Sequence, residues 1–296
     1  MKIAFFMGGA PANYVEDLLL AGLLAHLGPD NVAYSPHKDH FGAVRPARYP
    51  ERTCWTPNLP VALPDSALME YADGADLVVV GYPEDGERAG VLSEACARFG
   101  DKAVLVNGED GVVWRILHGL LPGRPWFVRE VDSRGGCPYE GQPISPLPLC
   151  FNTIDLPAVH PWEERDIPIL WVGAAHKHRK TYIDALRAVE GAMVVTDSVP
   201  HAEYSELLSR TRLAVVLHGV GPQSYRLFEV IAHGCDVLCQ VVKNIWIEDV
   251  QEFDSVDHFR GLLEGYRGRY IPELRRDLLI HHTHLARASH FLSRIP

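Results

Sequence analysis

Residues 213–234 are the stretch that most constrains how this chain can fold. An apolar run at 213–217 has the composition of a buried strand, and it continues through a loop with two glycines and a proline into a short helix ending at Gly234. A strand, a tight loop and a helix in this order are typical of a parallel α/β sheet. The loop amides and the start of the helix also favour an anion such as a diphosphate.

Two charged residues of the helix suit such a ligand. Arg226 lies in the first turn and offers a planar guanidinium to phosphate oxygens. Glu229 follows three residues later on the same helix face, where a carboxylate can accept two hydrogen bonds from a ribose diol. The sequence therefore favours a ligand with both a diphosphate and a ribose.

The alternation of strands and helices extends along the whole chain. Residues 2–7 predict a buried strand, Gly8 and Gly9 a turn, and Tyr14–Leu27 an apolar helix. Further strands are expected at 31–35, 76–81, 103–106, 126–131, 169–172, 192–196 and 237–240, and further helices at 66–72, 90–99, 181–189, 202–210, 256–267 and 274–292. This order predicts parallel sheets that bind ligands at the carboxyl ends of their strands.

Composition limits the class of protein. The 296 residues are 47% hydrophobic and 22% charged, which fits a globular protein with a sizeable core. The net charge of -10 argues against general nucleic-acid affinity. The chain has no apolar run of about 18 residues and no signal-peptide pattern, and its six cysteines lack paired spacing, so we expect no membrane span and a cytoplasmic location.

Several segments, in order, resemble the GT-B glycosyltransferases, and most closely their CgeB-like or "glycosyl transferases group 1" branch. The segment around Arg226 and Glu229 resembles the family's donor-sugar site, and residues 169–186 resemble the strand, glycine turn and helix that open its C-terminal domain. Phe127-Val-Arg129-Glu130 is similar to its F-K-R-E segment, and His282-Thr283-x-x-x-Arg287 to its closing helix. The matches span residues 105–292.

The resemblance implies a GT-B fold of two Rossmann-like parallel-sheet domains facing a cleft. Residues 1–155 would form the acceptor-side domain, 156–275 the nucleotide-sugar-binding domain, and 276–296 a helix that crosses back to the first domain. A rise in proline and glycine between residues 122 and 168 also marks a domain junction. The donor site would comprise Gly173, His176, Arg179, Lys180, Gly221, Ser224, Tyr225, Arg226 and Glu229.

One position departs from the family pattern. Many members carry two glutamates eight positions apart, and here the earlier position is Gly221, whereas Glu229 matches the later one. The contact of the first acid with the donor hexose therefore cannot be transferred to this chain.

Other candidates lie in the N-terminal half. Glu109 and Asp110 follow a strand, where one of them could act as a catalytic base or orient an acceptor, or both could serve only as partners of a helix dipole. Gly9 and Asn13 are placed on the acceptor side, although the glycines could simply permit a tight turn. His40, in a proline-rich segment at 36–64, could contact an acceptor or belong to a solvated surface.

These patterns predict a glycosyltransferase that moves a sugar from a nucleotide-diphosphate sugar, with UDP favoured, to an acceptor such as a small metabolite, a peptide or a modified nucleobase. The sequence has no D-x-D triplet, and the basic run at 176–180 with Arg226 could replace a metal, so metal-independent transfer without a cofactor is expected. Motifs of nucleophilic hydrolases and P-loop kinases are absent from the sequence. The alternative is a catalytically degenerate GT-B protein that binds a nucleotide sugar or a partner without turnover.

Overall fold

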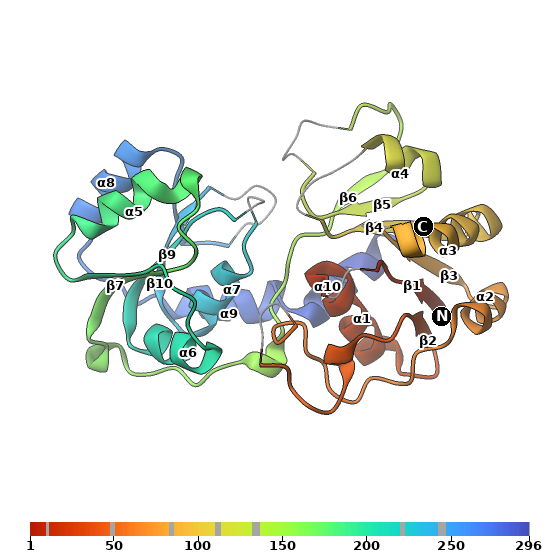
Figure 1. Ribbon diagram of the computed structural model, residues 1–296, viewed down its shortest axis with the longest axis horizontal. Helices are drawn as coiled ribbons and strands as arrows, with labels where there is room; N and C mark the ends of the chain where they lie inside the picture. The colour runs from red at the N-terminus through yellow and green to blue at the C-terminus, as the bar shows by residue number, and fades with distance from the viewer. Residues whose placement is uncertain are drawn as a thin grey trace. The chain divides into compact units, whose positions relative to one another are not determined.

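The computed structural model describes residues 1–9, 12–47, 51–82, 86–109, 114–131, 137–219, 223–241 and 247–295. The chain divides into two compact units. The first is Met1–Ile154 together with His282–Pro296, and the second is Asp155–His281. Each unit contains one parallel sheet with helices on both faces (Figure 1). Both units are therefore of the α/β class that the alternating pattern predicts.

The first unit has a six-stranded sheet in the order β2-β1-β3-β4-β5-β6. Its strands are β1 (Ile3–Phe6), β2 (Val32–Ser35), β3 (Leu77–Gly81), β4 (Ala103–Asn107), β5 (Trp126–Val128) and β6 (Ile144–Pro146). Its helices are α1 (Tyr14–Leu27), α2 (Asp65–Asp73), α3 (Gly86–Phe99), α4 (Trp114–Leu120), α10 (His284–Ser293) and the 3-10 turn η1 (Asp39–Phe41), and a second turn, η2 (Thr153–Asp155), lies where the chain leaves the unit.

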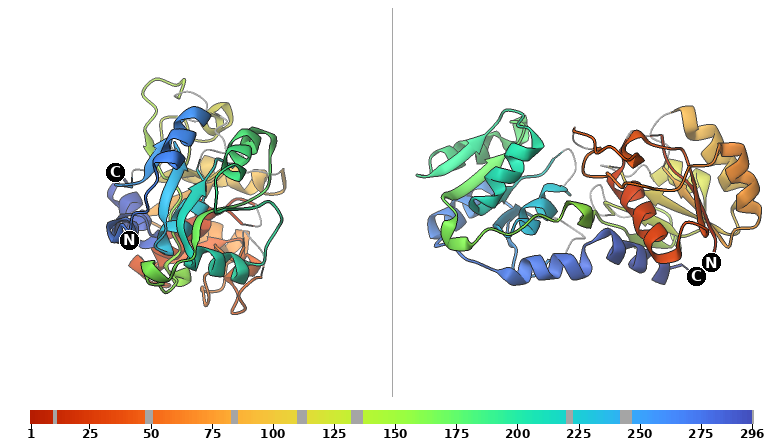
Figure 2. Two further views of the ribbon diagram at one scale, coloured as in Figure 1. Left: turned by 90° about the vertical axis from the view of Figure 1, so that its left-hand side faces the viewer. Right: turned by 90° about the horizontal axis from the view of Figure 1, so that it is seen from below.

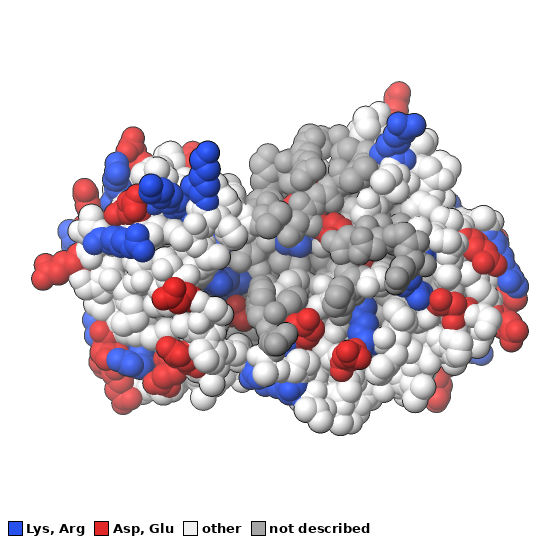
Figure 3. Space-filling model, in the orientation of Figure 1, with Lys and Arg blue, Asp and Glu red and all other residues white. Residues whose placement is uncertain are grey.

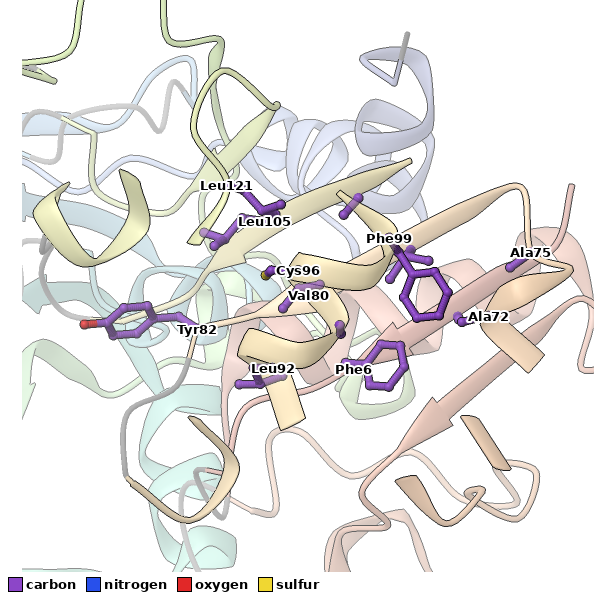
Figure 4. Packing of buried hydrophobic residues seen from close by; sticks show 14 of the residues in the cluster. Phe6, Ala72, Ala75, Val80, Tyr82, Leu92, Cys96, Phe99, Leu105 and Leu121 are labelled. Carbon is purple, nitrogen blue, oxygen red and sulfur yellow. The ribbon is translucent and has the colours of Figure 1, made fainter. Parts of the chain in front are cut away.

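Alternate residues of these strands face two helical layers. The side chains of Phe6 and Val80 pack against Leu92, Cys96 and Phe99 of α3, on the face that α2 also covers (Figure 4). Helices α1 and α10 pack against each other on the other face (Figure 2). Because both faces are covered, the central strands are buried along their whole length, which explains their continuous apolar runs.

The C-terminal segment differs from the single helix expected at 274–292. It forms two helices, α9 (Pro272–His281) in the second unit and α10 in the first. The backbone of Phe151 donates to the His282 carbonyl and accepts from the His284 amide, at 2.7 and 3.0 Å. Thr283 is extended, and its Oγ1 accepts from the amide of Ala286 to begin α10. The helix breaks because backbone groups at 282 and 284 pair with a strand-like segment instead.

The second unit has a five-stranded sheet in the order β11-β10-β9-β7-β8. Its strands are β7 (Ile167–Val172), β8 (Ala192–Val195), β9 (Thr211–Val216), β10 (Asp236–Gln240) and β11 (Gln251–Phe253). Its helices are α5 (Lys180–Arg187), α6 (His201–Ser209), α7 (Arg226–Ala232), α8 (Val256–Gly265) and α9, with 3-10 turns η3 (Trp162–Glu164) and η4 (Lys177–Arg179). The sequence pattern had not indicated β11, which has only three residues.

Helices cover both faces of this sheet as well. Helices α5 and α8 pack together on one face, over a core that includes Trp171, Tyr182 and Phe259. Helices α6, α7 and α9 lie on the other face. The outer surface of α5 and α8 carries basic and acidic side chains side by side (Figure 3), including exposed pairs within each helix. That surface has no single sign of charge.

Candidate functional site

The carboxyl edge of the second sheet has a topological switch point. Strand β7 pairs with β8 on one side and with β9 on the other, so the chain leaves β7 in one direction and β9 in the other. Ligands of parallel α/β sheets bind where the connections diverge in this way. Gly173 follows β7, and His218 lies just after β9, so the loops after β7 and β9 flank this point.

Arg179 joins these two loops. Its Nε donates to the His218 carbonyl at 2.6 Å, and its Nη1 donates to the Ala174 carbonyl at 2.9 Å. The side chain is buried, whereas His176 and Lys180 are exposed. The basic run predicted from the sequence is thus divided between one buried arginine that fixes the loops and neighbours that face solvent.

Arg226 lies beside the same glycine. A Cβ added to Gly173 would lie 2.6 Å from Arg226 Nη1 and 3.6 Å from Arg179 Nη1. The two guanidinium groups therefore converge on one face of this glycine, at the switch point. A methyl at this position would displace Arg226 Nη1 and press on Cζ2 of the buried Trp171 ring, 3.2 Å away. A pair of guanidiniums around bare backbone is suited to a phosphate group.

Glu229 lies next to Arg226, as the helical spacing predicts. The carboxyl group is buried, and burial raises its pKa to about 7, against the opposing effects of Arg226 and of a hydrogen bond with Tyr204. The Arg226 guanidinium also lies over the Tyr204 ring, 5.7 Å from its centroid. Arg226, Glu229 and Tyr204 thus form one cluster at the start of α7.

The other donor-site candidates differ in their surroundings. Tyr225 is buried, and its ring packs against Phe228. Ser224 is partly buried, and its carbonyl accepts from the amide of Leu227. Gly221 lies outside the described residues, as does Asp110 in the first unit.

The first unit has its own cluster at the carboxyl ends of β1, β3 and β4. Asn13 precedes α1, and its Nδ2 donates to Glu109 Oε1 at 3.0 Å. Glu16 accepts from the amides of Gly8, at 2.7 Å, and Tyr82, at 3.3 Å. Two side chains therefore connect the loops after β1, β3 and β4. They are Asn13, the cap of α1, and Glu16 in its first turn.

His40 belongs to the same cluster but does not lie on a solvated surface. It is 1% exposed, and its Nε2 is 3.0 Å from Asp17 Oδ2. Lys38 Nζ contacts the other oxygen of Asp17 at 2.6 Å. His40 is thus connected to this end of the sheet by its contact with Asp17. Gly9 lies apart from the cluster, beside the side chain of Arg88.

The sequence patterns did not indicate Glu16, Asp17 or Lys38 as site residues. A usable signal was present, because the residues from Tyr14 to Leu24 are apolar on every side of α1 apart from Glu16 and Asp17. Such a stretch of helix is buried on all sides, so its two acids are expected to be buried as well. The position of Lys38, on a loop without a sequence period, could not be inferred in this way.

The buried Glu16 gives a pH-dependent stability. Burial raises its pKa to about 7, with Lys38 and the Gly8 amide opposing this shift. The native state therefore holds a proton that the unfolded chain releases above about pH 4.5, so this group lowers the free energy of unfolding as pH rises to 7.

We expect Glu16→Gln to remove this contribution. The unfolding free energy of the variant, relative to the wild type, should rise between pH 5 and 7 by up to about 1.4 kcal/mol per pH unit. Urea denaturation at several pH values measures the difference, and Glu70→Gln, on the exposed side of α2, controls for the change in net charge. A difference that does not vary with pH would contradict the assignment.

The described residues show neither of two other classes of site. No helix in these ranges combines the length and the apolar composition that a membrane crossing needs. Over the same residues, histidine, cysteine and acidic side chains nowhere gather in threes in a way that could hold a metal ion.

Comparison with known proteins identifies the fold. No protein-family model matches the sequence, and no curated protein matches it either. Among solved structures, sucrose-phosphate synthase from Thermosynechococcus elongatus is 12% identical, with a TM-score of 0.59, and the match covers 99% of this chain and 98% of the other. HepE from Anabaena in complex with UDP is 10% identical, with a TM-score of 0.52 and 99% of each chain covered.

An α-glucosyltransferase in complex with UDP and a DNA 13-mer containing an HMU base is also similar. It is 10% identical, with a TM-score of 0.56, and the match covers 100% of this chain and 99% of the other. The matches extend over both units of the chain. With its six-stranded and five-stranded parallel sheets, the chain has the GT-B fold of these solved structures.

Proposed function

We propose that this protein is a metal-independent glycosyltransferase that moves a sugar from a nucleotide-diphosphate sugar, UDP favoured, to an acceptor. The observation that carries the proposal is the convergence of Arg179 and Arg226 on Gly173 at the switch point of the second sheet. Two structural neighbours, HepE and the α-glucosyltransferase, contain UDP, which supports a uridine nucleotide as the ligand.

Each group has a role in the proposed reaction. The bond between the anomeric carbon and the diphosphate oxygen breaks while the acceptor oxygen bonds to that carbon. Arg226 and Arg179 stabilise the charge on the leaving diphosphate, and Glu229 binds the ribose hydroxyls. Glu109 or its neighbour Asp110 accepts the proton of the acceptor.

Calorimetric titration with UDP tests the proposal. Wild-type protein should bind UDP, and Gly173→Ala should weaken binding roughly tenfold, because the new methyl displaces the Arg226 guanidinium and removes about one charge-assisted hydrogen bond. Some loss of stability is expected as well, because the new methyl lies 3.2 Å from Cζ2 of the buried Trp171 ring, so UDP affinity is measured where thermal unfolding shows the variant to be folded. Gly261→Ala, in α8 with no atom near its added Cβ, is the matched control. If wild-type protein binds neither UDP nor GDP at millimolar concentration, the proposed function is wrong.

Transfer is expected to survive removal of divalent metals. With no D-x-D triplet in the sequence, the arginine pair would stabilise the leaving diphosphate in place of a metal ion. Turnover of a nucleotide-sugar panel should be equal with and without EDTA. Complete loss that magnesium or manganese restores would overturn the metal-independent part of the proposal.

A catalytically degenerate nucleotide-sugar-binding protein is the second candidate. It is favoured by Gly221, which stands where many members of the resembled family carry an acid. Such a protein would bind UDP but neither transfer nor hydrolyse the sugar. Measuring hydrolysis of UDP-sugars by protein that binds UDP separates the two candidates.

A further inference from the structure

The side-chain amide of Asn13 has two functions that can be separated. Its Oδ1 caps α1 by accepting from the amides of Val15 and Glu16, both at 3.1 Å. Its Nδ2 donates to Glu109 Oε1, 3.0 Å away and on the loop after β4, and approaches Glu16 Oε1 at 3.4 Å. Capping needs only the oxygen, and serine or aspartate would cap equally well. The Nδ2 group is what distinguishes asparagine from those residues here.

Buried groups fix the position of Asn13. Its backbone amide donates to Asp17 Oδ2 at 2.8 Å, and Asp17 is in turn held by Lys38 and His40. Asn13 is 5% exposed and Asp17 fully buried. The amide group of Asn13 is therefore held in place by a network of buried side chains.

The loop that carries Glu109 is also fixed. Any Cβ at Gly108 would collide with Asn13 Oδ1, so the loop packs directly on this side chain. The Glu109 amide donates to Asn107 Oδ1 at 2.9 Å, and buried Arg129 donates to the Gly108 carbonyl at 3.2 Å. Glu109 itself is partly exposed. It is thus the member of this network that can meet a ligand at the carboxyl edge of the sheet.

We propose that Asn13 is a positioning residue that orients the Glu109 carboxylate toward the acceptor, so that Glu109 receives the acceptor's proton. The proposal rests on the proposed function, and it selects Glu109 as the acceptor-side group. A hydrogen bond donated to a carboxylate stabilises its ionised form, and therefore keeps it a competent base at lower pH. Loss of Nδ2 should lower the rate and move the acid limb of the pH–rate profile to higher pH.

Variants that keep the cap test this role. Asn13→Ser retains the cap but not the donor, and Asn13→Asp places a further carboxylate beside those of Glu109 and buried Glu16. The assay is release of sugar from UDP-sugars, with water as the acceptor, alongside UDP affinity by calorimetry and thermal stability. We expect Asn13→Ser to lower kcat roughly tenfold with UDP affinity unchanged, and Tm to fall only slightly because the helix cap is kept. Asn13→Asp should lower kcat further and shift the acid limb by more.

Two controls make the result specific. Ser255→Asn exchanges one good cap for another at α8 and should leave all readings unchanged. In a Glu109→Gln background, Asn13→Ser should cause no further loss of kcat, because it acts through Glu109.

The possible results distinguish a failure of this inference from a failure of the proposed function. If Asn13→Ser keeps the kcat and the pH profile of the wild type, the inference is wrong and the proposed function is unaffected. Additive losses of kcat in the double variant would have the same meaning. A loss of kcat that is matched by a lower Tm and weaker UDP binding also overturns it, because Asn13 would then serve only the fold. If wild-type protein releases no sugar, whether or not it binds UDP, the proposed transferase function and this inference both fail.

Discussion

Gly22→Ala is expected to lower the free energy of unfolding by about 1–3 kcal/mol, the usual cost of overpacking a close contact. Gly22 lies within α1 where α10 crosses it. An added Cβ would overlap the backbone carbonyl oxygen of His284 and come within 2.7 Å of the Ala288 Cβ. Neither contact is a flexible side-chain end, so α10 must move away from α1. Urea denaturation of wild-type and variant protein measures the effect.

The control variant is expected to raise the free energy of unfolding instead of lowering it. Gly90→Ala makes the same chemical change inside α3, where no atom lies within 4 Å of the new Cβ. Helix propensity alone acts there, and we expect a gain of about 0.5–1 kcal/mol. Equal stabilisation of both variants would contradict the close packing of α10 against Gly22 of α1.

Glu229→Gln is expected to weaken UDP binding roughly tenfold to a hundredfold at pH 8, while the melting temperature of the unliganded protein stays nearly unchanged. A lost hydrogen bond to a charged group costs about 1.5–3 kcal/mol, which corresponds to that range of affinity. Calorimetry and thermal unfolding on the same variant give both quantities. Glu203→Gln, on the exposed side of α6, removes a carboxylate away from the cluster and should alter neither.

The effect should also depend on pH. Burial raises the pKa of Glu229 to about 7, so the wild-type carboxyl is increasingly protonated below neutrality and then resembles the glutamine. The ratio of wild-type to variant affinity should therefore grow between pH 6 and 8. Because the variant lacks the Glu229 carboxyl, the pH dependence of its own affinity shows the effect of UDP titration, which the ratio removes. If UDP affinity is retained and stability falls, Glu229 serves as an internal partner of Arg226 and Tyr204.

Local patterns determined much of the fold. The apolar run of α1 and the glycine after it predict its bounds from Tyr14 to Leu27, because helix ends depend on nearby residues. The adjacency of Arg226 and Glu229 likewise follows from helical spacing. The order of strands and helices, read with the family resemblance, led to two parallel sheets and the GT-B fold.

Local patterns do not predict the structure where distant segments meet. The helix expected at 274–292 breaks because Phe151 pairs with residues on either side of Thr283, more than a hundred positions along the chain. Gly22 is required by the approach of α10, which no pattern within α1 reveals.

The candidate site divides in the same way. The sequence alone determined which residues carry charge beside a glycine turn, since that is a matter of spacing along one helix or loop. Only the tertiary structure decided that Arg179 is buried against two backbone carbonyls, that His40 and Lys38 converge on Asp17, and that Asn13 connects Glu109 to them. These contacts join loops whose positions are set by the sheet, and a side chain's burial and pKa depend on that three-dimensional neighbourhood.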